Sequence, residues 1–247
     1  MSENKNNEST IGGALVMAGL FLSIGVATAG YFVGNTLYKS RISANTATVK
    51  GLAEREVVAD VAVWQINFNV DGAELQNVYA QAHNNQARVV QFLITNGFAK
   101  QDISNGALTV NKLEHRDNSG NVQGISYEIN GSVALRTGDV AKVAAAQQRI
   151  GELLGQGVLV TNSNPAYLFT KLNDIKPEML GEATRNARIA AEQFAADANA
   201  SVGKIQSAAQ GAFDFSARDA RNEYEDHTYA INKKIRVVTT ITFYLED

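Results

Sequence analysis

The chain has 247 residues, a formal net charge of −3 at pH 7 and no cysteine. Without cysteine it forms no disulfide, thiolate metal site or cysteine nucleophile, and without a basic excess we predict no nucleic-acid partner. About 200 residues follow the apolar N-terminal segment, enough for one substantial core or two small lobes.

The N-terminal segment predicts a membrane anchor. Residues 11–33 are almost wholly apolar or small, and no charged side chain occurs from Ser9 to Tyr38. Since roughly 20 apolar residues in a helix cross a bilayer core of about 30 Å, this segment is long enough to span. We predict a polar tail at 1–10, a transmembrane anchor at 11–38 and a linker at 39–46.

A cleaved signal segment is the alternative to an anchor. Ala27-Thr28-Ala29 resembles a cleavage site. An uncleaved anchor is favoured because Lys5 stands against Glu3 and Glu8 at the start, which is not the basic start of a signal, and because the apolar run continues past the triplet. Lys39 and Arg41 follow the segment and only Lys5 precedes it, so the positive-inside rule by itself favours a cytoplasmic C-terminal part.

Two strands and a helix are predicted next. Residues 45–70 indicate two strands, because apolar and polar residues alternate through the second, which is typical of a half-buried strand. Asp71-Gly72 ends that strand. The apolar spacing over 73–96 is helical, and Asn96-Gly97 favours the end of this helix.

A hairpin and a second helix follow. Residues 107–115 and 125–137 are strand-like and flank the polar cluster 116–121, which predicts a hairpin. Asp139 is a predicted N-cap for a helix over 139–154. Short strands are expected near residues 158–160 and 167–172.

A third helix is predicted to begin with Pro177 at its first position and to run to about residue 200. Small side chains on one face let a helix lie close to a sheet. The predicted buried stripe consists of Met179, Leu180, Ala183, Ala187, Ala190, Ala191, Phe194 and Ala198.

The last part of the chain predicts two strands, over 202–215 and 235–245, separated by a polar exposed loop at 216–230. The whole order predicts an α+β fold over residues 47–247. Its sheet or sheets are largely antiparallel and covered by helices.

No catalytic, cofactor-binding or metal-binding residue is predicted. His83 lies on the polar side of the first helix, where a solvated side chain is expected. The sharpest metal hypothesis combines His115 with Glu225-Asp226-His227, although charged loops usually serve solvation. Hydrolase, zinc-protease and phosphate-loop motifs are absent from the sequence.

Several segments together resemble the SIMPL domain family, bacterial envelope proteins related to a Brucella periplasmic immunogenic protein and to the oxidative-stress protein YggE. The resemblance extends over about residues 46–246. It rests on residues 48–54, on Gly97 to Ile103, on the Ala-rich helix 183–195, and on Gly203-Lys204-Ile205.

This resemblance implies an extracytoplasmic domain, against the direction that the flanking charges favour. Combined with the anchor predicted from the sequence, it leads us to expect a single-pass protein of the bacterial inner membrane with its C-terminal domain in the periplasm. It also implies a large ring- or channel-like homo-oligomer, a link to oxidative or envelope stress, and no catalytic residue to carry over.

Three functional hypotheses follow. The first is a non-enzymatic, membrane-tethered assembly protein whose final strand is an edge available to partners through Val238, Thr240, Thr242 and Tyr244. The alternative is an extracytoplasmic binding module for a small ligand or partner protein. Its contacts would come from the loop residues Arg218, Arg221, Tyr224 and Tyr229. The third is a hydrolase or metal enzyme around His115 and His227.

Overall fold

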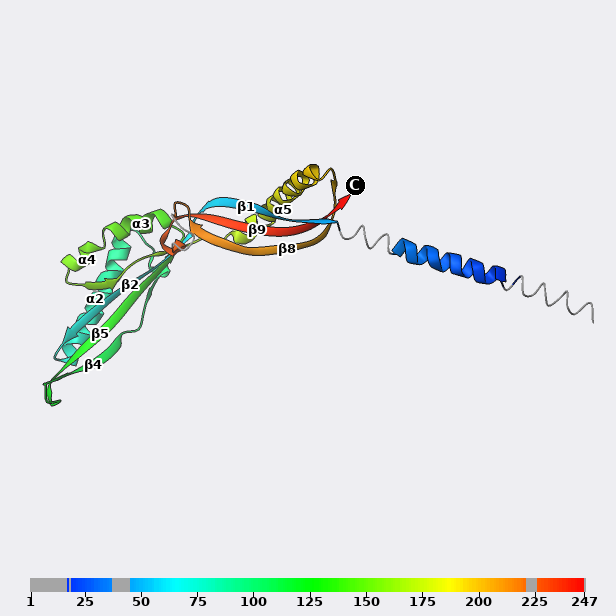
Figure 1. Ribbon diagram of the computed structural model, residues 1–247. Coiled ribbons are helices and arrows are strands. Elements are labelled where there is room, and N and C mark those ends of the chain that lie inside the picture. Colours follow the sequence, from blue (N-terminus) through cyan, green and yellow to red (C-terminus); the bar gives the residue numbers. More distant parts are fainter. Residues whose placement is uncertain (1–16, 18, 37–44, 221–225, 247) are drawn as a thin grey trace, which may run out of the picture. The chain divides into compact units, whose positions relative to one another are not determined.

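The computed structural model describes residues 17, 19–36, 45–220 and 226–246. The fold is α+β, with antiparallel sheets covered by helices (Figure 1). In chain order the elements are β1 Thr46–Val58, β2 Val61–Gly72, α2 Leu75–Thr95, η1 Lys100–Asp102, β3 Ile103–Asn105, β4 Thr109–Arg116, β5 Val122–Thr137, α3 Val140–Gln148, α4 Gly151–Gly155, β6 Leu159–Asn162, β7 Ala166–Leu168, α5 Leu172–Asp197, β8 Ser201–Ala217, η2 His227–Tyr229 and β9 Asn232–Glu246.

The predicted tail at 1–10 lies wholly outside the described residues, as do part of the predicted anchor at 11–38 and most of the linker at 39–46. Residues 19–36 are helical. Among the described residues, no helix combines the length and the apolar character needed to cross a membrane.

The described chain divides into two compact units. One contains the described residues of 1–52 together with 183–211 and 239–246, and the other contains 53–182 and the described residues of 212–238. The chain length allowed either one substantial core or two small lobes, and two lobes are observed. Each unit has its own apolar cluster of buried residues.

The first unit is built on the close approach of α5 to β1. Gly51 of β1 faces the helix, where a Cβ atom would lie 1.8 Å from the carbonyl oxygen of Ala183 and 2.5 Å from the backbone nitrogen of Ala187. The small side chains of α5 therefore meet a strand position that only glycine fits. Residue Asn186 adds a hydrogen bond of 2.7 Å from its side-chain amide to the carbonyl of Leu52.

The second unit is built on the antiparallel pair β2–β5. Trp64 pairs with Leu135 and Phe68 with Gly131 in this register. Helix α2 packs on both strands and α3 contacts β2. Trp64 is fully buried, and its indole N–H donates to the carbonyl of Ser163 at 2.7 Å.

The two sheets have different strand orders. The larger sheet runs β3-β5-β2-β6, with β4 added to β5 and β7 added to β2. The smaller sheet runs β1-β9-β8. The prediction that the final strand is an edge is therefore wrong: β9 lies between β1 and β8, and its alternating apolar positions are buried.

The structure confirms most of the predicted elements. The strands over 45–70, the helix over 73–96, the hairpin and the strand at 202–215 all occur within a few residues of their predicted bounds. Gly97 ends α2 with a φ of +86°, which is the left-handed conformation expected at a helix C-terminus. The strand expected at 167–172 is shorter: β7 ends at Leu168, and α5 begins at Leu172.

The single helix predicted over 139–154 is wrong, because it is divided into α3 and α4 around Arg149 and Ile150. The N–H of Glu152 bonds to the carbonyl of Arg149 at 2.9 Å, which is a tighter i→i−3 turn. Gly151 follows the break, and glycine favours helix continuation less than other residues. Asp139 holds the N-cap position without a side-chain capping bond.

Two details predicted for the third helix are also wrong. Pro177 lies inside α5, not at its first position. Pro177 is the sixth residue of α5, beyond the first four whose N–H groups lack helical partners, so it removes one i→i−4 hydrogen bond, to the carbonyl of Asn173. Phe194 is 63% exposed, because the buried face repeats every fourth residue and passes through Ala191 and Ala195.

Candidate functional site

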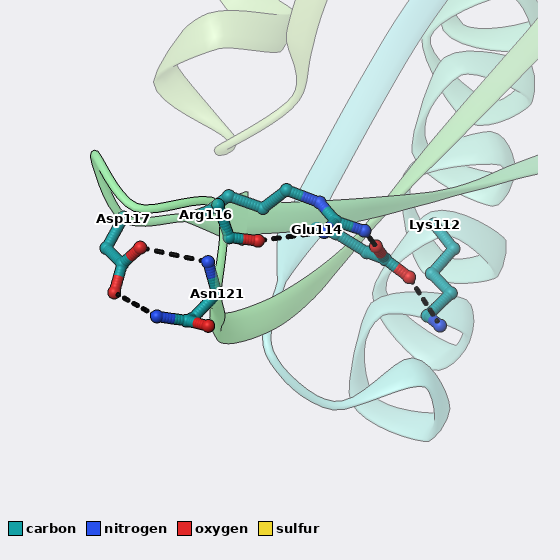
Figure 2. Close-up of polar contacts among 6 residues, drawn as sticks. Lys112, Glu114, Arg116, Asp117 and Asn121 are labelled. Carbon is teal, nitrogen blue, oxygen red and sulfur yellow. Dashed lines mark hydrogen bonds and ion pairs between the residues drawn. The ribbon is translucent and has the colours of Figure 1, made fainter.

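The β4–β5 hairpin has a row of charged side chains at its end (Figure 2). Lys112, Glu114 and Arg116 alternate along β4, so the period of a strand places them on one face. The Glu114 carboxylate accepts hydrogen bonds from Lys112 at 3.3 Å and from Arg116 at 2.7 Å. In the turn, the Asp117 carboxylate accepts the backbone N–H of Asn121 at 2.9 Å and its side-chain amide at 3.3 Å.

The electrostatics of this hairpin favour a solvated surface over a reaction centre. Hydrogen bonds from Lys112 and then Arg116 hold the pKa of Glu114 below its ordinary value. The backbone N–H of Asn121 is the largest cause that lowers the pKa of Asp117. Both carboxylates therefore stay ionised near neutral pH, whereas a general acid needs a raised pKa. Charges on such an exposed strand oppose pairing with another chain.

The three histidines have separate surroundings. His83 is exposed, as predicted. The ring Nε2 of His115 lies 2.8 Å from the hydroxyl of Ser126, and the ring of His227 stacks on Phe215 with centroids 5.8 Å apart. Among the described residues, no group of three or more histidine or acidic side chains could hold a metal ion. Glu225, part of the metal hypothesis, lies outside the described residues.

Lys233 is a buried cation that the sequence interpretation missed. It is 2% exposed, and its ammonium donates a hydrogen bond to the backbone carbonyl of His227. Burial lowers the pKa of Lys233, and the nearby charge of Asp226 opposes this. The available signal was its place in β9, where it falls on the same face as the buried Ile235.

The loop predicted to make binding contacts is described in part. Arg218 forms an ion pair with Asp219 at 2.9 Å, and the ring of Tyr229 is 54% exposed. Arg221 and Tyr224 lie outside the described residues. A separate open hollow of about 540 Å³ lies at the start of α3, lined by Val58, Gly138, Asp139, Val140, Ala141, Lys142 and Ile231.

Strand β8 is the most exposed regular element of the smaller sheet. It follows β9 at the end of the sheet order, so among the described strands it pairs with β9 alone. Residues 204–212 are exposed without the alternation of a half-buried strand, and Ile205 is 45% exposed. An exposed edge of this kind presents unpaired backbone groups to another strand.

Comparison with known proteins identifies a family. A family profile described as "SIMPL: Protein of unknown function (DUF541)" matches residues 47–243. A search of curated proteins found no match.

Two solved structures show distant similarity. One is a putative aminohydrolase from methicillin resistant Staphylococcus aureus, at 14% identity and a TM-score of 0.21, over 56% of this chain and 39% of that one. The other is an uncharacterized conserved protein from Listeria innocua, at 10% identity and a TM-score of 0.19, over 75% of this chain and 91% of that one. Overlap this weak carries no functional argument.

Proposed function

The chain belongs to the SIMPL family, and on that premise we propose that it is a non-enzymatic, membrane-tethered protein of the cell envelope that assembles with copies of itself. The assembly is a large ring- or channel-like homo-oligomer. A link to oxidative or envelope stress is part of the proposal and rests on the family resemblance.

The observation that carries the assembly proposal is the exposed strand β8. Residues 205–213 contain no charge and no proline. Natural proteins protect exposed strand edges with charges, prolines or covering segments, because an unprotected edge pairs with other chains. An unprotected edge of this length is explained if another chain covers it in the assembled protein.

The tether is supported by the N-terminal sequence. Residues 11–33 are apolar or small over a length that spans a bilayer as a helix. We place the protein in the bacterial inner membrane with one crossing and with residues 47–247 in the periplasm. Lack of cysteine fits an oxidising compartment, where a stray thiol is a liability.

The non-enzymatic role is supported by the polar clusters. The carboxylates of the hairpin have lowered pKa values, and the Lys233 ammonium is occupied by a backbone carbonyl. These groups stabilise local structure, and none of them has the arrangement of a nucleophile beside a base.

Cross-linking in intact bacteria tests this function with the full-length chain. A membrane-permeable amine-reactive reagent is expected to yield multimers of the chain in the membrane fraction. Alkaline carbonate is expected to leave the chain in the pellet, and protease added to spheroplasts is expected to degrade it. Complete release by carbonate, or protection from protease until the inner membrane is lysed, would contradict the proposed tether or location.

A small-ligand binding module is the second candidate, favoured by the hollow at the start of α3. Its lining combines Val58, Val140 and Ile231 with the charged Lys142. Ala141 is exposed beside it, so Ala141→Trp is expected to fill the hollow. If the protein binds ligand there, this variant should lose any rise in melting temperature produced by periplasmic extract, while circular dichroism stays unchanged.

A further inference from the structure

Strand β8 carries a charge pattern that complements itself in the reverse direction. In Ser201–Ala217 the only charged residues are Lys204 and Asp214. Each lies five residues from Ala209, which is also the midpoint of the strand. Both side chains are exposed. Two copies of this strand running antiparallel about Ala209 therefore place opposite charges across from each other.

We infer that β8 pairs with β8 of a second copy of this chain, antiparallel and about a two-fold axis at Ala209. This rests on the proposed function, since it names one contact of the assembly. Lys204 lies opposite the partner's Asp214 in this register, and Ile205 lies opposite the partner's Phe213. Directly opposed residues share one face of a sheet, so the charges meet on one face and the apolar pair on the other.

The apolar pair uses side chains that are still accessible. Ile205 is 45% exposed. Phe213 is half-buried, with Lys176 lying 5.6 Å from its ring centroid on its own chain. An aromatic ring opposite a β-branched side chain is among the favourable cross-strand pairs.

The opposite edge strand of the same sheet, β1, carries more charges, and this favours pairing of β8 with a second β8 over pairing of β8 with β1. Strand β1 ends the sheet order on the other side and carries four charges, at Lys50, Glu54, Arg55 and Glu56. Charged edges resist strand addition. Pairing of like with like through β8 closes as a two-fold contact, whereas pairing of β8 with β1 would continue from chain to chain. Further growth into a ring needs a second contact elsewhere on the chain.

Single cysteines test the register directly, because the chain has no cysteine of its own. Ala209→Cys in the full-length protein, in mild detergent with copper-phenanthroline, is expected to form a disulfide-linked dimer. Ala212→Cys is the matched control, since both residues are exposed alanines of β8. Its two copies would lie about 20 Å apart along the paired strands. Because a disulfide needs Cα atoms about 4.4–6.8 Å apart, the control should cross-link at least about tenfold less.

Exchange of the two charges is a second test of the proposed β8 pairing. Lys204→Asp places like charges opposite each other twice, so the dissociation constant of the pair is expected to rise about tenfold. Asp214→Lys should act in the same way, and the double variant Lys204→Asp/Asp214→Lys should restore wild-type affinity. Circular dichroism of each variant checks folding.

The outcomes separate the two proposals. Cross-linking at residue 209 only, together with rescue by the double variant, supports the β8 pair. Equal cross-linking at both positions or at neither, with a wild-type mass that is still oligomeric, would overturn this pair and leave the proposed assembly intact. A wild-type chain that is monomeric by light scattering would overturn both.

Discussion

Gly51 shows how one residue limits the first unit at the residue scale. A side chain at this position would meet backbone atoms of Ala183 and Ala187, and backbone cannot rotate away as a side-chain end can. The close approach of α5 to β1 thus depends on the absence of a Cβ atom as much as on the small residues of the helix.

Gly51→Ala is therefore expected to lower the free energy of unfolding by about 3 kcal/mol, because overpacking against backbone forces the helix away from the strand. Urea unfolding followed by circular dichroism measures this. Gly124→Ala is the control, since a Cβ atom there meets nothing within 4 Å, and its effect should stay within about 0.5 kcal/mol. Equal effects for the two variants would contradict the close-packing account.

Thr239 presents the opposite case, a buried group that costs stability. Its side chain is 5% exposed, and its hydroxyl has no hydrogen-bond partner among the described residues. Thr239→Val keeps the shape, removes the unpaired hydroxyl and is expected to raise the free energy of unfolding by about 1 kcal/mol. Thr239→Ser keeps the hydroxyl, loses a methyl group and should lower it. Thermal or urea unfolding measures the stability of both variants. A valine variant less stable than wild type would show that the hydroxyl of Thr239 makes a hydrogen bond.

Lys233 gives a pH dependence at alkaline pH. Its pKa in the folded protein is lowered by burial from the ordinary value of 10.5. Between the lowered pKa and 10.5 the unfolded chain binds more protons than the folded one, so stability rises with pH across this window.

The contribution of Lys233 to the free energy of unfolding can be isolated by comparing wild type with a variant that lacks the lysine. The unfolding free energy of wild type minus that of Lys233→Met is expected to increase as pH rises toward 10.5. Urea unfolding at a series of pH values between 7 and 10.5 measures it. A flat difference would mean that this lysine titrates alike in both states.

At the scale of elements, the Asp60 carboxylate joins the β1–β2 connection to the segment after β7. It accepts the backbone N–H of Thr170 at 2.8 Å and the hydroxyl of the same residue at 2.9 Å. Burial raises the pKa of Asp60, but the hydrogen bonds from Thr170 and the charge of Lys171 lower it further, so the net direction is downward from 3.8.

A depressed carboxylate pKa stabilises the fold above the unfolded value and loses that contribution as pH falls through the folded value. Asp60→Ala is therefore expected to cost about 1.5–3 kcal/mol at neutral pH, the range for hydrogen bonds to a charged group. The cost should shrink well below pH 3.8. Asp71→Ala, at an exposed aspartate of β2, is the control and should change little at either pH. A cost for Asp60→Ala that does not vary with pH would contradict the charged role.

The elements that the sequence predicted well are those with strong local patterns. Period-two alternation located β2 and β9, and the polar turn located the β4–β5 hairpin. The missed features depend on distant contacts. The central position of β9 is set by its pairing with β1 and β8, and the buried place of Lys233 by a carbonyl from η2. The helix break near Arg149 is a local feature that the glycine at 151 indicated in retrospect.

The exposed strand proposed for assembly, β8, is likewise a feature that depends on distant contacts and was missed from the sequence. From the sequence we predicted that the C-terminal strand, β9, mediates assembly, because β-branched residues alternate there on both faces. Strand order cannot be derived from one strand's composition, and the exposed edge is β8. The uncharged run at 205–213 was visible in the sequence, but only the sheet order makes it an edge.

At the scale of the whole molecule, an apolar N-terminal segment precedes a domain whose smaller sheet has one edge strand with four charges, β1, and one edge strand with two, β8. Charge on β4 and β1 limits pairing at those strands, and its absence over most of β8 directs pairing to one place. A tether would also confine the copies to a membrane surface and raise their effective concentration, which favours a weak edge contact.

The most direct test of the account is the mass of the full-length chain in mild detergent, measured by light scattering with the detergent contribution subtracted. The account predicts a discrete multiple of the chain mass of 26.6 kDa. A mass of 26.6 kDa at every concentration would contradict assembly.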